Sequence, residues 1–385
     1  MRKVFVSYNN IMSSLGFSSK TVVENIHKEI SGVKLIDNEN LFTKPFYSSL
    51  IDTKALQQQF STIGSVQEYT RLEQMMISSL SATIKNSGLK ITDRVGLLIA
   101  TTKGNVDALD ETNPFDKERA YLSELGQQVG DFFGFQQKPI IVSNACVSGI
   151  LAVAVAKRYI TQGVYDHMFI VSGDVVTEFI LSGFNSFQAM SDEICKPYCK
   201  TRKGINIGEV SASVLITSDE NYITTEAVEI LGEGSCNDAN HISGPSRTGE
   251  GLYRSIDSAL KQAKMSSNEI DYISAHGTAT NYNDEMEAIA FNRHDLSKVP
   301  VNSLKGYFGH TLGTSGLLET IVGMHSLKNN TLYTSLGFEE LGVSEPINVI
   351  QKTTPKQLNV FLKTASGFGG CNTAVIFKRP QLNQL

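Results

Sequence analysis

The sequence contains 385 residues, of which 41% are hydrophobic and 19% are charged, and its net charge is −5. A chain of this length and composition buries a large core and forms two or three globular domains. Because the total charge is mildly acidic and no dense basic cluster occurs, the sequence excludes a nucleic-acid-binding protein.

Short β-forming runs alternate with helical patterns along the chain. In chain order, the patterns predict a helix at 69–87, strands at 95–100 and 139–143, a helix at 149–162, strands at 168–172 and 214–217, a helix at 249–263, a strand at 272–275, a helix at 316–327 and a strand at 360–363. This alternation is typical of a layered α/β fold with buried, mostly parallel strands.

A weak internal repeat supports two related halves. The segments 139–151 and 301–318 both read as a strand, a turn of small residues and an apolar helix, and Ser148-Gly149 in the first corresponds to Ser315-Gly316 in the second. We therefore expect two halves, residues 1–218 and 219–385. Chance similarity between two strand–helix units is the alternative.

Neither a leader nor a membrane segment is expected. No apolar leader follows the first residues, and the most apolar run (149–156) is much shorter than the ~20 residues that span a bilayer. The sequence therefore predicts a cytoplasmic protein without a membrane partner.

The cysteines indicate reduced thiols. The sequence has five, an odd number at irregular spacing, which does not fit a disulfide framework. Cys195 and Cys199 lack a second close Cys or His pair, so no metal site is expected.

Cys146 is the first candidate catalytic residue. It follows a predicted strand and precedes a predicted helix, which places its sulfur near the positive end of the helix dipole. That position is expected to lower the thiol pKa and favour a nucleophilic thiolate. A buried structural cysteine is the alternative.

Two histidines are the next candidates. His276 ends a predicted strand, in the segment 274–280, and His310 precedes the helix that corresponds to the one after Cys146. The repeat is expected to bring His310 opposite Cys146. Lys305 and Glu287 are placed to form an ion pair that fixes both histidine loops. Structural roles for both histidines, and solvated surface charges for Lys305 and Glu287, are the alternatives.

The segment 366–372 has the sequence Ser-Gly-Phe-Gly-Gly-Cys-Asn. Its glycines allow backbone torsions that other residues avoid and leave N–H groups free to face a ligand. Neither a P-loop nor a Rossmann fingerprint is present, so nucleotide cofactors are not expected.

Together these segments resemble the β-ketoacyl-acyl-carrier-protein synthases of the thiolase superfamily, the elongating type with a Cys-His-His triad. The resemblance covers nearly the whole chain, and its anchors are the segments 143–149, 276–280, 305–311 and 367–370, with supporting stretches at 196–209 and 238–241. It implies the thiolase-like five-layered αβαβα fold, built from two related halves.

The resemblance implies a decarboxylative Claisen condensation. Cys146 would carry the acyl group as a thioester, and His276 and His310 would stabilise the enolate formed when malonyl-acyl carrier protein loses CO2. Lys305 and Glu287 would support the histidines. No cofactor and no metal are implied.

The resemblance also assigns binding residues and partners. Phe368 would gate the acyl pocket and share an oxyanion hole with Cys146, whereas Thr278, Thr280, Gly369 and Gly370 would bind substrate. The expected partner is acyl carrier protein carrying acyl and malonyl groups on phosphopantetheine. A homodimer is expected, and a heterodimer with a related subunit is the alternative.

Four residues depart from the family pattern: Val147, Val210, Ser366 and Cys371. They affect the pocket rather than the triad, and they favour a specialised pathway, such as pigment or polyketide assembly, over housekeeping fatty-acid synthesis. Three alternative functions are a non-catalytic partner subunit that determines chain length, a Cys-His thiol hydrolase and a structural interaction protein.

Overall fold

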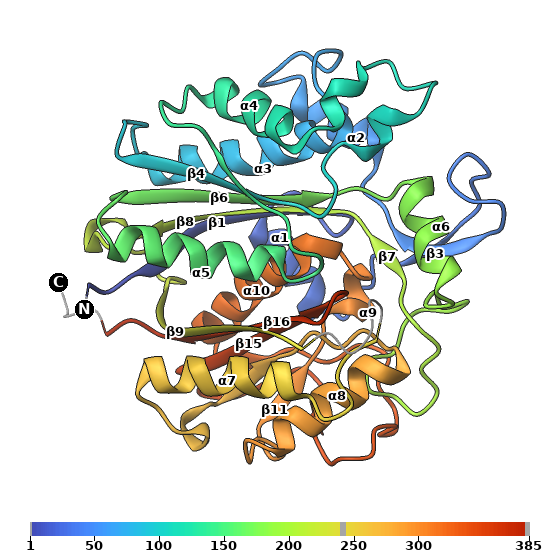
Figure 1. Ribbon diagram of the computed structural model, residues 1–385, viewed down its shortest axis with the longest axis vertical. Helices are drawn as coiled ribbons and strands as arrows, with labels where there is room; N and C mark the ends of the chain where they lie inside the picture. The colour runs from blue at the N-terminus through green and yellow to red at the C-terminus, as the bar shows by residue number, and fades with distance from the viewer. Residues whose placement is uncertain (1, 239–243, 382–385) are drawn as a thin grey trace.

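The computed structural model describes residues 2–238 and 244–381. Its elements stack in five layers (Figure 1): α3 (Arg71–Ser87) and α4 (Leu122–Phe133) on one outside, and α7 (Glu250–Ala263) and α8 (Asn281–Asn292) on the other. Between them lie two groups of strands that enclose α5 (Ser148–Thr161) and α10 (Ser315–Asn329). This is the αβαβα arrangement expected from the sequence.

Eleven strands form one hydrogen-bonded series, and its two parts repeat the same pattern. The first part runs in the order β1 (Phe5–Ser13), β8 (Val210–Thr217), β6 (His167–Asp174), β4 (Val95–Ala100), β5 (Ile140–Val142). The second runs in the order β9 (Val228–Asn237), β16 (Cys371–Lys378), β15 (Val360–Gly367), β10 (Tyr272–Ser274), β11 (Pro300–Asn302), β13 (Asn348–Val349). In both parts, two antiparallel pairings are followed by parallel ones.

The two parts meet between β1 and β9, which pair only at Phe5–Glu229 and Val6–Val228. From this narrow junction they lie on opposite sides of α5 and α10 (Figure 1). The repeated strand pattern supports the two related halves. The division after residue 218, between the end of β8 and the start of β9, stays a prediction.

The expectation of mostly parallel strands was wrong. Antiparallel pairings join β1, β8 and β6 in the first part and β9, β16 and β15 in the second. β16 follows β15 after residues 368–370, and so short a connection can join only antiparallel neighbours. β6 and β8 are also antiparallel, although α6 and β7 lie between them in the chain.

The surface helices have sequence-encoded ends. At the start of α3, Thr70 and Glu73 form a capping box, and Gly88 ends the helix in the left-handed conformation. The helix α10 lacks a polar face, and every residue from Ser315 to Leu327 is buried. A helix that is buried all round belongs between two sheets, and α10 lies there.

The remaining elements lie at the edges of this core. They are α1 (Ser19–His27), α2 (Thr53–Phe60), α6 (Glu178–Ser186), α9 (Lys305–Phe308), β2 (Lys34–Ile36), β3 (Phe46–Ser49), β7 (Ile207–Gly208), β12 (Thr331–Leu332), β14 (Thr354–Pro355), and the 3-10 turns η1 (Val106–Leu109), η2 (Lys117–Ala120), η3 (Glu220–Tyr222), η4 (Ser267–Glu269) and η5 (Leu312–Thr314). No helix within the described ranges is long and apolar enough to cross a membrane.

The two central helices touch through glycine. A methyl group added at Gly149 would lie 2.7 Å from the carbonyl oxygen of Gly313, and one added at Gly316 would lie 2.7 Å from the backbone nitrogen of Ile150. Both distances are too short for real Cβ contacts. The repeated Ser-Gly pair therefore marks the place where the helices of the two halves approach backbone to backbone.

We predict that Gly149→Ala and Gly316→Ala each lower the free energy of unfolding by about 1–3 kcal/mol, because backbone atoms cannot move aside as side chains can. Gly183→Ala, in α6, is the control, since a methyl group there meets nothing within 4 Å. It is expected to stabilise by at most about 1 kcal/mol, through helix propensity. Urea unfolding measures all three, and equal effects would contradict the packing argument.

Candidate active site

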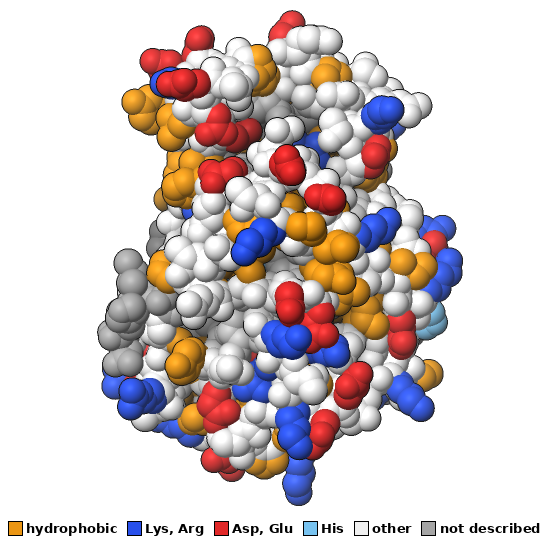
Figure 2. Space-filling view, turned by 90° about the vertical axis from the view of Figure 1, so that its right-hand side faces the viewer, with side chains coloured by type: hydrophobic (Ala, Val, Ile, Leu, Met, Phe, Trp, Pro, Cys, Tyr) orange, Lys and Arg blue, Asp and Glu red, His pale blue; other side chains and the backbone are white. Residues whose placement is uncertain are grey.

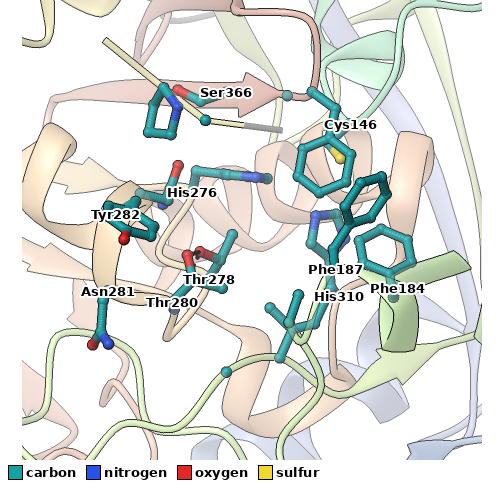
Figure 3. A pocket seen from close by; sticks show the side chains of 18 of the residues that line it. Cys146, Phe184, Phe187, His276, Thr278, Thr280, Asn281, Tyr282, His310 and Ser366 are labelled. Carbon is teal, nitrogen blue, oxygen red and sulfur yellow. Dashed lines mark hydrogen bonds between the residues drawn. The ribbon is translucent and has the colours of Figure 1, made fainter. Parts of the chain in front are cut away.

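A cavity of about 380 Å³ opens where loops of both halves meet, and it contains Cys146, His276 and His310 (Figure 3). Cys146 and His310 lie at one end of it, beside Phe184 and Phe187. The sulfur of Cys146 and one ring nitrogen of each histidine all lie within 4.8 Å of one another. The structure thus brings together three side chains that are far apart in the sequence.

The turn before α5 positions Cys146. The hydroxyl of Ser148 accepts a hydrogen bond from the amide of Asn144 (2.8 Å) and donates one to the carbonyl of Ala145 (2.7 Å). Ala145 has a positive φ of 42°, which is unusual for a residue with a side chain. This fixed turn places the Cys146 side chain at the cavity.

The expected lowering of the Cys146 pKa was wrong. Burial raises the pKa of this thiol to about 12, and neighbouring Cys371 adds to the effect. The positive charges of Lys103 and Lys305 oppose the rise without cancelling it. Removing water from a thiolate therefore outweighs its favourable position before a helix. Cys146 is a thiol at neutral pH, and its proton must leave during the reaction.

His276 follows β10 and is held by its backbone. The carboxylate of Glu287 accepts the amide N–H of His276 (2.9 Å) and that of Gly277 (2.7 Å). The ammonium of Lys305 donates to the carbonyl oxygen of His276 (2.6 Å). Gly277 has a φ of 45°. The loop after β10 is therefore fixed on both sides of the imidazole.

His310 lies between α9 and η5. Its Nδ1 accepts a hydrogen bond from the amide of Leu312 (2.9 Å). A neutral imidazole carries a proton on only one nitrogen, so this contact assigns the N–H to Nε2. The ring of His310 meets that of His276 edge to face, with 5.1 Å between the centroids. His310 is thereby prepared as an Nε2–H donor.

Both imidazoles are uncharged at neutral pH. Burial lowers the pKa of His276 and of His310 well below the usual value, and the positive charge of Lys305 lowers both further. His310 also acts on His276, and Lys103 acts on His310. The site therefore contains a neutral thiol and two neutral imidazoles.

The expected ion pair between Lys305 and Glu287 is not formed. Lys305 pairs with Glu319 (2.9 Å), whereas Glu287 binds backbone amides and the hydroxyl of Tyr198 (2.9 Å). Lys305 and Glu287 do hold the same loop, the first at the carbonyl of His276 and the second at its amide. They thus support His276 separately, and sequence spacing could not reveal the partner on α10.

The sequence analysis missed Glu319 and Lys363. Lys363, on β15, pairs with the second oxygen of Glu319 (2.7 Å), and both side chains are fully buried. The one available signal was a lysine within a strand of otherwise apolar character, because a charged residue at such a position needs a buried partner.

An aromatic cluster covers the end of the cavity near Cys146. The ring of Phe368 lies 5.5 Å from that of Phe184 and 5.4 Å from that of Phe187, centroid to centroid, and Phe184 also approaches His310. The sequence analysis did not single out Phe184 and Phe187, which lie near the end of α6. Aromatic residues at this spacing also occur on the buried face of an ordinary amphipathic helix. Phe368 is 37% exposed, so it lies at the mouth of the cavity, as a gate requires.

The predicted substrate-binding residues Thr278, Thr280, Gly369 and Gly370 all line the cavity. The two threonine hydroxyls share a hydrogen bond of 2.8 Å, and Asp284 accepts the amide of Thr278 (2.8 Å). In the supporting stretch 238–241, residues 239–241 lie outside the described residues.

The three donors of the triad are of the types that bind zinc. Among the described residues, Cys195 and Cys199 do not take part in any cluster of potential metal ligands. The arrangement suits the attack of a thiol on an organic substrate.

The face of the molecule that carries α6 is partly apolar. Figure 2 shows hydrophobic side chains across its middle, with acidic and basic side chains around them. Phe179 and Phe187, at the two ends of α6, are about half exposed. The approach to the cavity thus combines apolar side chains with mixed charge.

Comparison with known proteins agrees with the fold. A family model described as "Beta-ketoacyl synthase, N-terminal domain" matches residues 15–221, and one described as "Beta-ketoacyl synthase, C-terminal domain" matches residues 227–339. The chain belongs to the β-ketoacyl synthase family. Membership confirms the resemblance and the predicted enzyme class, an acyltransferase that acts as a β-ketoacyl synthase.

Individual β-ketoacyl synthases match over most of the chain. The chain is 24% identical to 3-oxoacyl-[acyl-carrier-protein] synthase 1 of Buchnera aphidicola, over 98% of this chain and 100% of that one. It is 32% identical to 3-oxoacyl-[acyl-carrier-protein] synthase 2 of Rhizobium meliloti, over 62% and 60%. A ketosynthase solved in complex with its chain length factor, from Xenorhabdus doucetiae, superposes with a TM-score of 0.85 at 22% identity, covering 98% of both chains. This confirms the fold.

The lowered histidine pKa values predict acid sensitivity of this β-ketoacyl synthase. An unfolded histidine takes up a proton below about pH 6.5, whereas buried His310 does not, so unfolding becomes easier as pH falls. Replacing His310 by Asn should therefore reduce the loss of stability between pH 6.5 and 5 by about 1–2 kcal/mol. Urea unfolding at both pH values measures this, and an unchanged difference would show that His310 is protonated in the folded state.

Proposed function

We propose that the enzyme joins an acyl group on Cys146 to malonyl-acyl carrier protein by decarboxylative Claisen condensation. The observation that carries the proposal is the convergence of one thiol and two neutral imidazoles in one cavity. A two-step reaction that needs a nucleophile, a proton acceptor and N–H donors to an oxyanion uses all three groups.

In the first step, the sulfur of Cys146 attacks the carbonyl carbon of the acyl thioester. Neutral His276 accepts the thiol proton and passes it to the departing thiol of the carrier, so that one thioester replaces another. The oxyanion lies between the backbone N–H groups of Cys146 and Phe368. The absence of a side chain at Gly367 supports this, because a methyl group there would lie 3.0 Å from the nitrogen of Cys146 and obstruct its N–H.

In the second step, malonyl-carrier protein loses CO2 and its thioester becomes an enolate. The Nε2–H of His310, assigned from the contact with Leu312, donates to the enolate oxygen, and His276 assists. The enolate carbon attacks the thioester on Cys146, and a new carbon–carbon bond forms. The 3-oxoacyl product stays on the carrier, and the expelled Cys146 thiolate takes up one proton from solvent, which replaces the proton that left with the first carrier's thiol.

Carrier protein fits the shape of the cavity. Thr278 and Thr280 line it on the side opposite the aromatic cluster (Figure 3), where their hydroxyls are placed to contact a pantetheine arm. The 3-oxoacyl-[acyl-carrier-protein] synthases among the relatives have this partner in their names. The cytoplasmic location stays a prediction.

The edge strand β5 supports a dimer. It ends the series of eleven strands, and Ile140, Ile141 and Val142 are only partly buried in the single chain. A second copy that pairs with this edge would cover them. The other possible arrangement is a heterodimer, in which a related but dissimilar subunit pairs with this chain. It is suggested by the similar ketosynthase that was solved in complex with its chain length factor.

The alternative functions explain less of the site. A chain-length-determining subunit needs no nucleophile, and a thiol hydrolase does not need a second imidazole. A structural protein would not bury three uncompensated reactive groups beside one cavity.

We predict that Cys146→Ala abolishes transfer of the acyl group to the enzyme. Cys236→Ser, on β9 and outside the cavity lining, is the matched control and should acylate like the unaltered enzyme. Intact-protein mass spectrometry after incubation with acyl-carrier protein detects the adduct. An adduct that persists in Cys146→Ala would reject Cys146 as the nucleophile.

We also predict that His310→Ala still forms the acyl adduct but releases CO2 from malonyl-carrier protein about 10²–10³-fold more slowly, which is the usual effect of removing one oxyanion donor. His294→Ala is the control, because His294 stacks on Tyr253 away from the cavity. Radiolabelled CO2 release measures the second step alone. Equal release by His310→Ala and the unaltered enzyme would remove His310 from that step.

A further inference from the structure

Three charged side chains form a buried triad next to His276. Lys305 and Lys363 each bind one oxygen of Glu319, at 2.9 and 2.7 Å, and all three side chains are at most 2% exposed. They come from α9, α10 and β15. Two ammonium groups and one carboxylate leave the triad with one positive charge.

Lys363 is protonated despite its burial. Its ammonium lies within hydrogen-bond distance of the carbonyl oxygens of Ser274 (3.1 Å), Ala275 (3.3 Å) and Thr364 (2.5 Å), and of the carboxylate of Glu319. All four atoms are acceptors. A neutral amine has only two N–H donors and a lone pair that would face an oxygen, so the surroundings require the ammonium form.

These contacts connect Lys363 to His276, the residue that accepts the proton of Cys146. Ser274 and Ala275 are the two residues before His276, and Lys305 binds the carbonyl of His276 itself. The three consecutive carbonyls that lead to the imidazole thus all face the triad. A change at Lys363 reaches His276 through its backbone and through its electrostatic surroundings.

The buried carboxylate of Glu287 is a further charge beside His276, and it offsets part of the triad's positive charge. Glu287, from α8, accepts hydrogen bonds from two backbone amides, Tyr198 and Asn283, which stabilise its own charge. His310 and Cys146 are neutral. Burial lowers the pKa of His276 first, and then Lys305, His310 and Lys363 lower it further.

We propose that Lys363 is a positioning residue that holds the strand end before His276 and, as the second cation on Glu319, keeps His276 unprotonated. This rests on the proposed function, in which neutral His276 accepts the proton of Cys146. An imidazolium cannot accept a proton. The net charge of the triad therefore sets how far the pH can fall before acylation of Cys146 stops.

The test compares variants that differ in the charge of the triad. Lys363→Gln removes one positive charge and keeps two N–H donors for the carbonyls. Adding Glu319→Gln restores the net charge of one, now on Lys305 alone. Lys157→Gln is the control, because Lys157 is another largely buried lysine, placed on α5 roughly 14 Å along the helix from its start.

NMR of ¹³C-labelled imidazole gives the titration midpoint of His276. We expect Lys363→Gln to raise this midpoint, because one positive charge beside the imidazole is lost, and the double variant to bring it back down. Lys157→Gln should leave it unchanged. Mass spectrometry measures the rate of Cys146 acylation at each pH. The pH at which this rate falls on the acid side should shift with the His276 midpoint, whereas a purely structural defect would lower the rate at every pH.

An unchanged midpoint in Lys363→Gln, or a double variant that stays raised, would overturn the proposal. Lys363→Met removes the same charge and is used if Lys363→Gln does not fold. The proposed function fails separately: the unaltered enzyme would then form no adduct on Cys146, whatever the midpoint of His276 in the variants.

Discussion

The contact between α5 and α10 controls the geometry of the whole molecule. Glycine in both helices lets their backbones meet, and each helix begins at a catalytic loop: Cys146 before α5 and His310 before α10. The distance between sulfur and imidazole is therefore set by a packing contact of the fold rather than by flexible side chains. A larger residue at Gly149 or Gly316 would move one half relative to the other, and the cavity would open between them.

The same arrangement explains the unusual electrostatics. The three side chains are buried where loops of the two halves meet, and burial raises the thiol pKa and lowers those of both imidazoles. Neutral groups suit a reaction in which an acyl thioester must not hydrolyse and an enolate must form beside it. The charged residues Lys305 and Lys363 lie behind the site, around Glu319. They bind the carbonyl oxygens of residues 274–276, and their charge acts electrostatically on His276.

Sequence reasoning found the elements whose patterns are strong and local. The helix at 69–87 and the strand at 95–100 match α3 and β4 almost residue by residue, and the Ser-Gly repeat located both central helices. It missed β1 and β9, because their pairing depends on residues far away in the chain, and it missed β16, which pairs with the neighbouring β15 and the distant β9. It gave Lys305 the wrong partner for the same reason: the choice between Glu287 and Glu319 is decided by which helix packs above the lysine. The thiol pKa was wrong because a helix start visible in the sequence says nothing about burial.

Three of the four departures named from the sequence lie next to Cys146 or in the gate loop, and the fourth, Val210, begins β8. Ser366 binds Asn372 (2.7 Å), and the thiol of Cys371 lies against the carbonyl of Phe368 (3.4 Å), so both support the loop that carries the gate. Val147 is the residue just after the nucleophile and is fully buried. The catalytic side chains and their buried supports are separate from these positions. Changes in the loop can therefore reshape the acyl pocket while the triad stays in place, which is how one condensation chemistry can serve different acyl chains.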